Sequence, residues 1–463
     1  MLRERLNRVA YFGLHRLIGS DLAKHYKEFL HLEKGSYEWL RDLQTQRLGR
    51  LLSYAASEIP FYRKHVSHRA EYVLSDFPVL TKSDIRDSFE DLMSSQIRQE
   101  HLSAKQNWSY SWISVQTGGS TGTPTTVIHD KNFRDLNRAA RLYTQRLCGF
   151  PIGTPYFKLW GSMREINDAN ESLQQRIAST LAGELMLNAF RMEGSQIDSY
   201  VQAINHSSID HLMAYSDAAY RMAEHIRAAR LKVRPLKSVM ACAGTLTDEM
   251  RQSISNAFGQ ARVHNMYGSR DCGAMACECL HGGFHILENK VILETVDQAG
   301  APVSPGEAGR ILVTLLGNYG FPMIRYEIGD VGSMSRTRCD CGIPTAVLDR
   351  VKGRTVEFIL SAIGGYISPA YIFHLIGVVH NSGVIRRFQI VQDALDHAVL
   401  SLEKESGAEE AMINDSIANI RRDLLTVFGA GMKLEIKVVD RIPESNSGKF
   451  IACINRMGRS AGL

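Results

Sequence analysis

The sequence predicts an α/β protein with a large N-terminal domain, in which β-sheets are flanked by helices in several layers, and a small α+β C-terminal domain. Helical patterns alternate with short β-rich runs through the middle of the chain, as in layered α/β folds. The 463 residues are enough for one large domain and a small one. The apolar pattern restarts beyond the glycine at residue 353, which predicts domains at 1–352 and 353–463.

The first long helix is expected between residues 35 and 65. Leu48, Leu51 and Leu52 recur at three- and four-residue steps. Pro60 is expected to stop this helix, because proline lacks the N–H group that the helix needs and its ring clashes with the preceding turn. Strands are expected at 156–159, 238–241, 263–266 and 310–315, and in the C-terminal domain at 356–360 and 433–439.

Composition and charge exclude several classes of protein. With 44% hydrophobic and 22% charged residues, the chain has the balance of a globular protein and excludes collagen, a coiled coil and wholesale disorder. A net charge of +5, from 54 basic and 49 acidic residues, gives no reason to expect a nucleic-acid partner. No apolar run approaches the roughly 18 residues of a transmembrane segment.

The N-terminal segment does not have the pattern of a signal peptide, because His15 and Arg16 interrupt its apolar run. We therefore expect a cytoplasmic protein. The segment is expected to pack on its own domain as a helix, with contact to a membrane surface as the alternative. Four of its apolar residues could form one stripe with basic flanks: Leu2, Leu6, Val9 and Leu17.

The most informative segment is a loop rich in glycine and hydroxyl side chains. Its glycines let the backbone approach a ligand closely, and its N–H and hydroxyl groups suit phosphate oxygens. It lacks the lysine of a Walker A loop, and the β-branched residues 125–128 favour a strand after it. The pattern predicts a phosphate-binding loop between two strands, with a plain hairpin as the alternative. The loop consists of Thr117, Gly118, Gly119, Ser120, Thr121, Gly122, Thr123 and Pro124.

Together with four later stretches, this loop resembles the motifs of the adenylate-forming superfamily, most closely the phenylacetate–coenzyme A ligase and CapK-like branch. The stretches are MYGSRD at 266–271, RYEIGD at 325–330, GRT at 353–355 and PESNSGK at 443–449. The resemblance implies that ATP and a carboxylic acid form an acyl-AMP with release of pyrophosphate. It also implies that the small domain is mobile and rotates between this step and acyl transfer.

The resemblance implies a nucleotide site in which residues 117–123 hold the β- and γ-phosphates of ATP. Further implied positions are Gly244 beside adenine and the acyl pocket, Tyr267 against adenine, Gly268 and Ser269 at the phosphates, Asp330 at the ribose hydroxyls and Arg354 near the ribose. A tyrosine ring can stack on a base, and an ionised carboxylate can accept hydrogen bonds from both ribose hydroxyls.

Two residues are implied to act on the reacting groups. Lys449 matches the C-terminal lysine that bridges the substrate carboxylate and the α-phosphate, where a compact cation offsets negative charge. Asp271 stands where the family usually has the glutamate that holds Mg²⁺, and its side chain is one methylene shorter.

Four residues could form a structural zinc site: Cys279, His285, Cys339 and Cys341. Three thiolates and one imidazole complete a tetrahedral Zn²⁺ shell and leave no position for water. The phenylacetate-ligase-like branch includes members with this set. Cys277 is the alternative to Cys279, and a set of free thiols is the alternative to a metal site. Disulfide frameworks belong to small secreted chains, so bridges are not expected.

The resemblance leaves the acyl acceptor open. Coenzyme A is the expected acceptor, and an amine or hydroxyl acceptor in polysaccharide or natural-product biosynthesis is the alternative. A non-catalytic relative that acts as a binding protein is a further alternative. The sequence does not identify the carboxylic acid substrate, because scattered residues build an acyl pocket, and it leaves a homodimer open.

Overall fold

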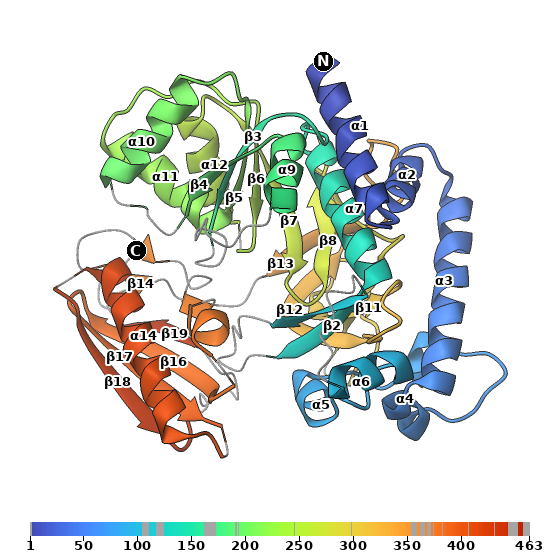
Figure 1. Ribbon diagram of the computed structural model, residues 1–463. Coiled ribbons are helices and arrows are strands. Elements are labelled where there is room, and N and C mark those ends of the chain that lie inside the picture. Colours follow the sequence, from blue (N-terminus) through green and yellow to red (C-terminus); the bar gives the residue numbers. More distant parts are fainter. Residues whose placement is uncertain are drawn as a thin grey trace.

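The computed structural model shows an α/β fold around one eleven-stranded mixed sheet (Figure 1). The order of its strands is β10-β11-β12-β13-β9-β8-β7-β6-β5-β3-β4. The structure describes residues 2–103, 111–116, 125–161, 173–189, 192, 194–244, 246–297, 299–352, 359–361, 366–367, 372–373, 375–381, 383–405, 407–429, 431–442 and 452–456.

Helices make up the N-terminal segment. They are α1 (Leu2–Leu17), α2 (Leu22–Leu32), α3 (Tyr37–Glu58), α4 (Pro60–His65), η1 (Leu74–Asp76), α5 (Lys82–Asp87) and α6 (Ser95–Leu102). The long helix expected at 35–65 is divided in two, as Pro60 predicts. Ile59 is extended between α3 and α4, and Pro60 is the first residue of α4. Proline is tolerated there because the first N–H groups of a helix form no intrahelical hydrogen bonds.

One half of the main sheet is parallel, in the order β4-β3-β5-β6-β7. These strands are β3 (Tyr156–Trp160), β4 (Glu184–Asn188), β5 (His211–Tyr215), β6 (Ser238–Cys242) and β7 (Arg262–Ser269). The helices that accompany them are α7 (Lys131–Leu147), α9 (Leu173–Ala182), α10 (Gly194–Asn205), α11 (Ser216–Ala228) and α12 (Asp248–Ala257). The carboxyl ends of parallel strands meet at one edge of a sheet, where open α/β folds bind ligands.

Alternate strand residues face two different apolar cores, as the two-residue period of a strand requires. Phe157 and Val239 belong to the core shared with α10, α11 and α12. Tyr156 and Met240 belong to the core shared with α2 and α7. Helices therefore cover both faces of the parallel half, which fixes the strand ends in place.

The other half of the sheet is antiparallel, and its core includes residues of α3. Its strands are β8 (Gly273–Glu278), β9 (Phe284–Ile286), β10 (Val291–Val296), β11 (Gly309–Leu315), β12 (Tyr326–Met334) and β13 (Val347–Lys352). A separate hairpin pairs β1 (Trp112–Gln116) with β2 (Thr126–Asp130).

The C-terminal part has a sheet of its own, in the order β18-β17-β16-β19, and an apolar core of its own. Its elements are β14 (Ile359–Leu360), β15 (Tyr366–Ile367), η3 (Leu375–Val379), β16 (Ile385–Ala394), β17 (His397–Lys404), α14 (Glu410–Phe428), β18 (Lys433–Val439) and β19 (Cys453–Asn455). The strands expected at 156–159, 238–241, 263–266, 310–315 and 433–439 are all present. The boundary between 352 and 353 stays a prediction, since residues 353–358 lie outside the described part of the chain.

Among the helices that the structure describes, none has the length and apolarity needed to cross a membrane.

Candidate functional site

The end of β7 and the turn into β8 form the first part of the candidate site. The strand register shifts just before Gly268, and a Cβ atom on this glycine would lie 2.7 Å from the carbonyl oxygen of Gly273. Only glycine fits this close approach. The hydroxyl of Ser269 accepts a hydrogen bond from the Cys272 N–H at 3.1 Å, which closes the tight turn that carries Asp271.

Two tyrosine–aspartate hydrogen bonds join this turn region to β12. The Tyr267 hydroxyl donates to Asp330 Oδ2 at 2.9 Å, and the Tyr326 hydroxyl donates to Asp271 Oδ2 at 2.6 Å. Strands β8, β9 and β13 lie between β7 and β12 in the sheet order, so both bonds connect residues that the sheet itself does not pair. The structure therefore brings together Tyr267, Asp271 and Asp330, which the sequence assigns to one nucleotide site.

Asp271 is buried and is nevertheless held in its ionised form. Its residue is 3% exposed. Burial raises the pKa of this carboxyl group, but the Lys82 ammonium and hydrogen bonds with Ser269 and Tyr326 outweigh it and hold the pKa below its ordinary value. An ionised carboxylate is the ligand type that Mg²⁺ prefers, so Asp271 fits the metal chemically. Because Tyr326 already binds Oδ2, a metal ion would have to use the remaining acceptor positions of this carboxylate.

Lys290 lies completely buried beneath the same turn. Its ammonium donates to the carbonyl oxygens of Cys272 and Ala274, each at 2.6 Å, and lies 5.1 Å from the ring centre of Phe133. Burial lowers the pKa of Lys290 to about 7. Lys290 thus holds the backbone of Cys272 and Ala274, at the start of β8 and directly after Asp271.

Gly244 lies just after β6, at the edge where the parallel strands end. The Ser216 hydroxyl is 3.3 Å from the carbonyl oxygens of both Cys242 and Gly244, and these contacts tie the strand end to the start of α11. Ala243 has a φ of 60°, a left-handed conformation that is uncommon for a residue with a Cβ atom. Strained backbone of this kind is concentrated at functional sites, which supports the place given to Gly244.

Aromatic side chains lie at the neighbouring strand ends. Trp160 ends β3 and Tyr215 ends β5, and their ring centres are 4.0 Å apart. The Lys158 ammonium is 5.8 Å from the Trp160 ring centre and forms an ion pair with Glu184 at 2.6 Å. Both rings are half-buried, at the edge of the sheet where the parallel strands end.

The strands expected on both sides of the glycine-rich loop are present. They pair antiparallel, with Gln116 opposite Thr126, so the two ends of the loop are adjacent. Arg86 donates to the Thr125 hydroxyl at 3.2 Å, directly after the loop. The loop itself, 117–124, lies outside the described residues, and so does the PESNSGK stretch at 443–449.

The roles given to residues 117–123, to Arg354 and to Lys449 therefore stay predictions. The structure neither brings these residues to the described site nor separates them from it.

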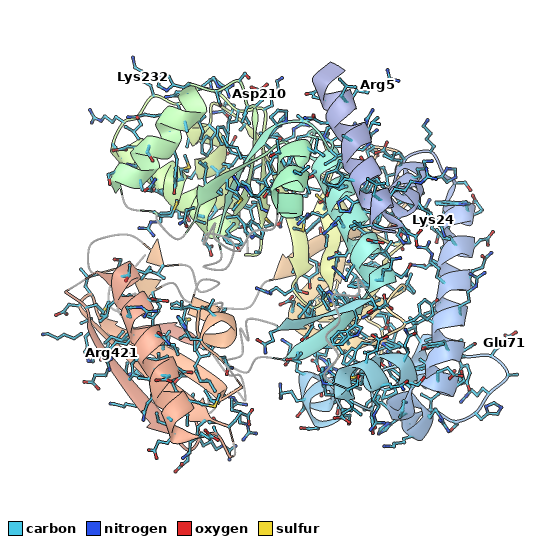
Figure 2. All side chains as sticks on the ribbon, viewed as in Figure 1. Arg5, Lys24, Glu71, Asp210, Lys232 and Arg421 are labelled. Carbon is cyan, nitrogen blue, oxygen red and sulfur yellow. The ribbon has the colours of Figure 1, made fainter. Side chains whose placement is uncertain are left out.

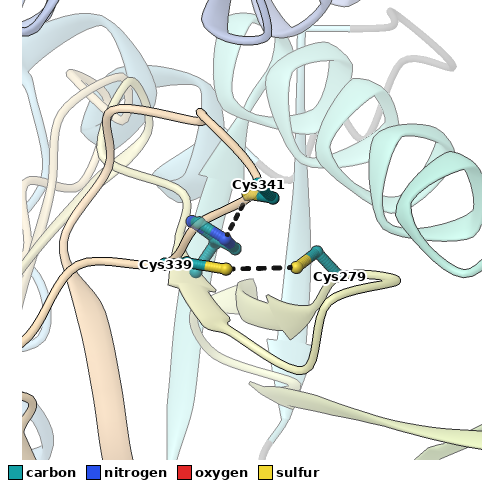
Figure 3. Close-up of side chains that lie close together, drawn as sticks. Cys279, Cys339 and Cys341 are labelled. Carbon is teal, nitrogen blue, oxygen red and sulfur yellow. Dashed lines mark hydrogen bonds between the residues drawn. The ribbon is translucent and has the colours of Figure 1, made fainter.

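The four proposed zinc ligands form one cluster. One ligand atom from each of Cys279, His285, Cys339 and Cys341 lies within 4.8 Å of all the others. The thiols of Cys279 and Cys339 are 3.7 Å apart, and the Cys341 thiol is 3.1 Å from His285 Nε2 (Figure 3). Cys277 lies elsewhere, with its thiol 3.6 Å from that of Cys148 in an apolar core, so the geometry selects Cys279.

The surroundings of the cluster also fit a metal. Burial lowers the pKa of His285 to about 4, which keeps the imidazole neutral, and its Nδ1 is 2.9 Å from the Thr345 hydroxyl. A partner on the second ring nitrogen is the usual way in which a protein orients a metal-binding histidine. A Cβ atom on Gly283 would be 2.4 Å from the Cys339 thiol, so glycine is needed to admit this thiol. All eight cysteines are described, and each is a free thiol.

The cluster connects two parts of the candidate site. Cys279 follows β8 and His285 belongs to β9, whereas Cys339 and Cys341 lie between β12 and β13. A metal ion held by these side chains would link the hairpin after Asp271 to the segment after β12.

Sequence reasoning missed several residues of the site. Tyr326 belongs to the RYEIGD stretch, but it was assigned no role from the sequence. In the structure its hydroxyl contacts Asp271. Lys82 carried no signal, and Lys290 stands in a polar run that is typical of an exposed turn. His129 Nε2 is 2.7 Å from the Asp271 carbonyl oxygen, a contact between distant segments that no local pattern predicts.

The chain is similar in sequence to several known proteins. Residues 359–456 match the family model of the CapK C-terminal domain. The chain is 24% identical to Protein CapK of Staphylococcus aureus, over 94% of this chain and 93% of that protein. It is 23% identical to the phenylacetate–coenzyme A ligase of Thermus thermophilus, over 90% of this chain and 97% of that protein.

A solved structure shows the same fold. This structure is 2-hydroxyisobutyryl-CoA ligase in complex with 2-HIB-AMP and CoA in the thioesterification state. It is similar with a TM-score of 0.57 and 19% identity, over 92% of each chain. At this identity the likeness shows the α/β architecture alone.

Proposed function

We propose that this chain, which is similar to members of the phenylacetate–coenzyme A ligase and CapK-like branch of the adenylate-forming superfamily, activates a carboxylic acid with ATP to give an acyl-AMP and pyrophosphate. The observation that carries the proposal is the pair of hydrogen bonds from Tyr267 to Asp330 and from Tyr326 to Asp271. They place an aromatic ring and two carboxylates together at the edge of the sheet where the parallel strands end.

In the first step an oxygen of the substrate carboxylate attacks the α-phosphorus of ATP. The bond from this phosphorus to the oxygen that bridges to the β-phosphorus breaks, and pyrophosphate leaves. Two anions must meet, so the site needs cations and hydrogen-bond donors that are already oriented. We assign the β- and γ-phosphates to residues 117–123 and the reacting oxygens to Lys449, and bound Mg²⁺ at Asp271 would neutralise phosphate oxygens.

Asp330 and Tyr267 would bind the nucleoside in this scheme. An ionised carboxylate has about four acceptor positions, so Asp330 can keep its bond to Tyr267 and still accept from two ribose hydroxyls. The Tyr267 hydroxyl bond fixes the ring, which presents its face to adenine. Arg354 is proposed to support the ribose, close to the start of the small domain.

In the second step we propose coenzyme A as the acceptor. Its sulfur attacks the acyl carbon, the bond from this carbon to the phosphate oxygen of AMP breaks, AMP leaves and the thiol proton passes to solvent. An amine or hydroxyl acceptor is the alternative, and the match of residues 359–456 to the CapK C-terminal domain is a reason to test it. The domain at 353–463 would rotate between the two steps.

We propose that the four-residue cluster binds Zn²⁺ as a structural ion. The donor set of three sulfurs and one imidazole nitrogen is typical of zinc, and four protein ligands leave no position for a substrate. The ion would brace the nucleotide site and take no part in the reaction.

A panel of carboxylic acids, with ATP and Mg²⁺, tests the proposed function. Pyrophosphate release is measured with and without coenzyme A, and hydroxylamine traps any acyl-AMP as a hydroxamate. Lys449→Ala is expected to lower adenylation about 10²- to 10³-fold, the cost of losing a preorganised electrostatic donor, while ATP binding is kept. Lys437→Ala is the matched control, because this exposed lysine of β18 pairs only with Glu435 among the ion pairs of the described residues.

The outcomes separate the proposed classes. Acid-dependent pyrophosphate release that yields a thioester only with coenzyme A supports the ligase. Acid-dependent release with no thioester, and with amide or ester formed from an added amine or alcohol, supports the alternative acceptor. ATP binding without any pyrophosphate exchange supports a binding protein, and equal activity of Lys449→Ala and Lys437→Ala overturns the role of Lys449.

A further inference from the structure

A stripe of apolar side chains on α1 faces away from the rest of the protein. Leu6, Val9 and Leu17 are 60%, 65% and 85% exposed, and they are among the four most exposed large apolar residues of the described chain. Together with Gly13 they follow one another at three- and four-residue steps, so they share one face of the helix. A Cβ atom built on Gly13 would have no atom within 4 Å, which shows that this face is open.

The opposite face of α1 is fixed to the body of the protein. Tyr11 and His15 are each 4% exposed, and their ring centres are 4.7 Å apart. Phe12 packs on Tyr26 of α2 at 5.3 Å, and Arg138 Nη1 of α7 is 3.1 Å from His15 Nδ1. The fold therefore holds the helix in one orientation and directs the stripe outward.

Two of the exposed arginines of α1 flank this outward face. Arg5, Arg8 and Arg16 are exposed. At about 100° per residue, Arg5 and Arg16 fall directly beside the stripe. The helix has four arginines and only one acidic residue, Glu4. Figure 1 shows the N-terminal half of α1 extending beyond the neighbouring helices, and Figure 2 shows Arg5 at the outer end of this helix.

The charge of α1 distinguishes between two possible binding partners of the apolar stripe, a second copy of the chain and an anionic bilayer. A second copy of this chain would bring two arginine-rich helices together, and their like charges would repel. An anionic bilayer offers an apolar interior for the stripe and phosphate groups for the arginines. The combination of an outward apolar face with basic flanks therefore fits a lipid surface better than a copy of the chain.

We propose that α1 is an interfacial membrane anchor that lies flat on an anionic phospholipid bilayer. Leu6, Val9 and Leu17 enter the boundary between headgroups and acyl chains, and Arg5 and Arg16 contact lipid phosphates. The surface is separate from the nucleotide site, so this interaction is independent of the proposed reaction. It would place the enzyme at a membrane without crossing it.

Co-sedimentation with sucrose-loaded vesicles tests this surface. The full chain is mixed with vesicles of phosphatidylcholine alone or with phosphatidylglycerol added, and the bound fraction is measured at low and high salt. We expect binding to the anionic vesicles that weakens as salt rises. Leu6→Ser with Val9→Ser is expected to abolish it, and Arg5→Gln and Arg16→Gln should each lower the binding constant about fivefold.

Two further variants sharpen the test. Gly13→Leu fills the gap in the stripe without meeting any other atom, and it should raise the binding constant about tenfold. Leu102→Ser is the matched control, because Leu102 of α6 is 61% exposed and lies outside the stripe, and it should have no effect. Circular dichroism and melting temperature check that every variant is folded.

The proposal is overturned if no vesicle binding occurs, or if Leu102→Ser weakens binding as much as the changes in the stripe. It is also overturned if light scattering shows a dimer that Leu17→Ser dissociates, because the stripe would then bind a second copy of the chain. Gain of binding in Gly13→Leu together with loss in the serine variant supports it.

Discussion

The Tyr267 hydroxyl donates a hydrogen bond to Asp330 Oδ2 across 2.9 Å and so links the end of β7 to β12. This bond ties the proposed adenine platform to the proposed ribose acceptor. Because Gly329 has a φ of 93°, the strand takes a left-handed step immediately before Asp330. The two proposed nucleoside contacts would therefore depend on one another and on the backbone conformation at Gly268 and Gly329.

Tyr267→Phe is expected to weaken ATP binding about tenfold. A hydrogen bond to a charged acceptor contributes about 1.5–3 kcal/mol, and its loss frees the ring that is proposed to stack on adenine. The KM for ATP in pyrophosphate exchange should rise, with a smaller change in kcat. Tyr37→Phe is the control, because Tyr37 is an exposed residue of α3. An unchanged KM for ATP in Tyr267→Phe would show that the hydrogen bond from Tyr267 to Asp330 does not contribute to nucleotide binding.

Asp271→Asn is expected to lower pyrophosphate exchange about 10²-fold and to raise the Mg²⁺ concentration needed for half-maximal rate. The amide removes the negative charge but keeps the shape of the side chain. Tyr326→Phe should have a weaker effect, because it removes one hydrogen bond from the carboxylate and leaves the charge. A slower rate with unchanged Mg²⁺ dependence would instead give Asp271 a purely structural role.

Much of the fold follows from local patterns, and part of the site does not. The strands predicted at 156–159, 238–241, 263–266, 310–315 and 433–439 and the break at Pro60 agree with the structure, because periodicity and proline geometry act over a few residues. Tyr267, Asp271 and Asp330 were proposed as site residues because each belongs to a recognisable motif, and their hydrogen bonds join the MYGSRD and RYEIGD stretches. Lys82 and Lys290 were missed, because their roles arise from packing between distant segments, and a lysine in a polar run is usually exposed.

The structure also distinguishes two thiols between which the sequence left the choice of metal ligand open, because only Cys279 belongs to the four-residue cluster. Cys277 and Cys279 are two residues apart on a strand segment, so their side chains point to the same side, and spacing cannot separate them. Cys279 lies just beyond the end of β8, where the chain turns toward Cys339, whereas Cys277 is inside β8 and packs against Cys148. The difference depends on where the strand ends, which residue spacing does not fix.

Purified protein is expected to contain about one zinc ion per chain by elemental analysis. Cys341→Ser should lose the ion and lower the melting temperature, since structural zinc sites contribute to folding stability. Cys277→Ser should keep the ion, because this thiol contacts Cys148 and lies outside the four-residue cluster. Thr345→Val removes the partner of His285 Nδ1 and should weaken zinc binding about 10- to 100-fold. A zinc content near zero in the unmodified protein would remove this site.

Lys290→Met is expected to change how stability depends on pH. Burial holds the pKa of Lys290 at about 7 in the folded protein, against 10.5 for an ordinary lysine. Between these values the unfolded chain binds a proton that the folded chain does not, so the lysine side chain favours folding more as pH rises from 7 to 10.5. Below pH 7 both states carry the proton, and the cost of burying the charge is fully present.

Methionine cannot titrate, so this contribution disappears in the variant. The free energy of unfolding of the unmodified protein, minus that of Lys290→Met, should therefore rise with pH by up to about 1.4 kcal/mol per unit. Urea unfolding at pH 7, 8 and 9 measures the difference, and Lys437→Met is the exposed control. Two parallel stability curves would show instead that Lys290 keeps its proton in the folded protein throughout this range, where its ammonium can donate to the carbonyl oxygens of Cys272 and Ala274.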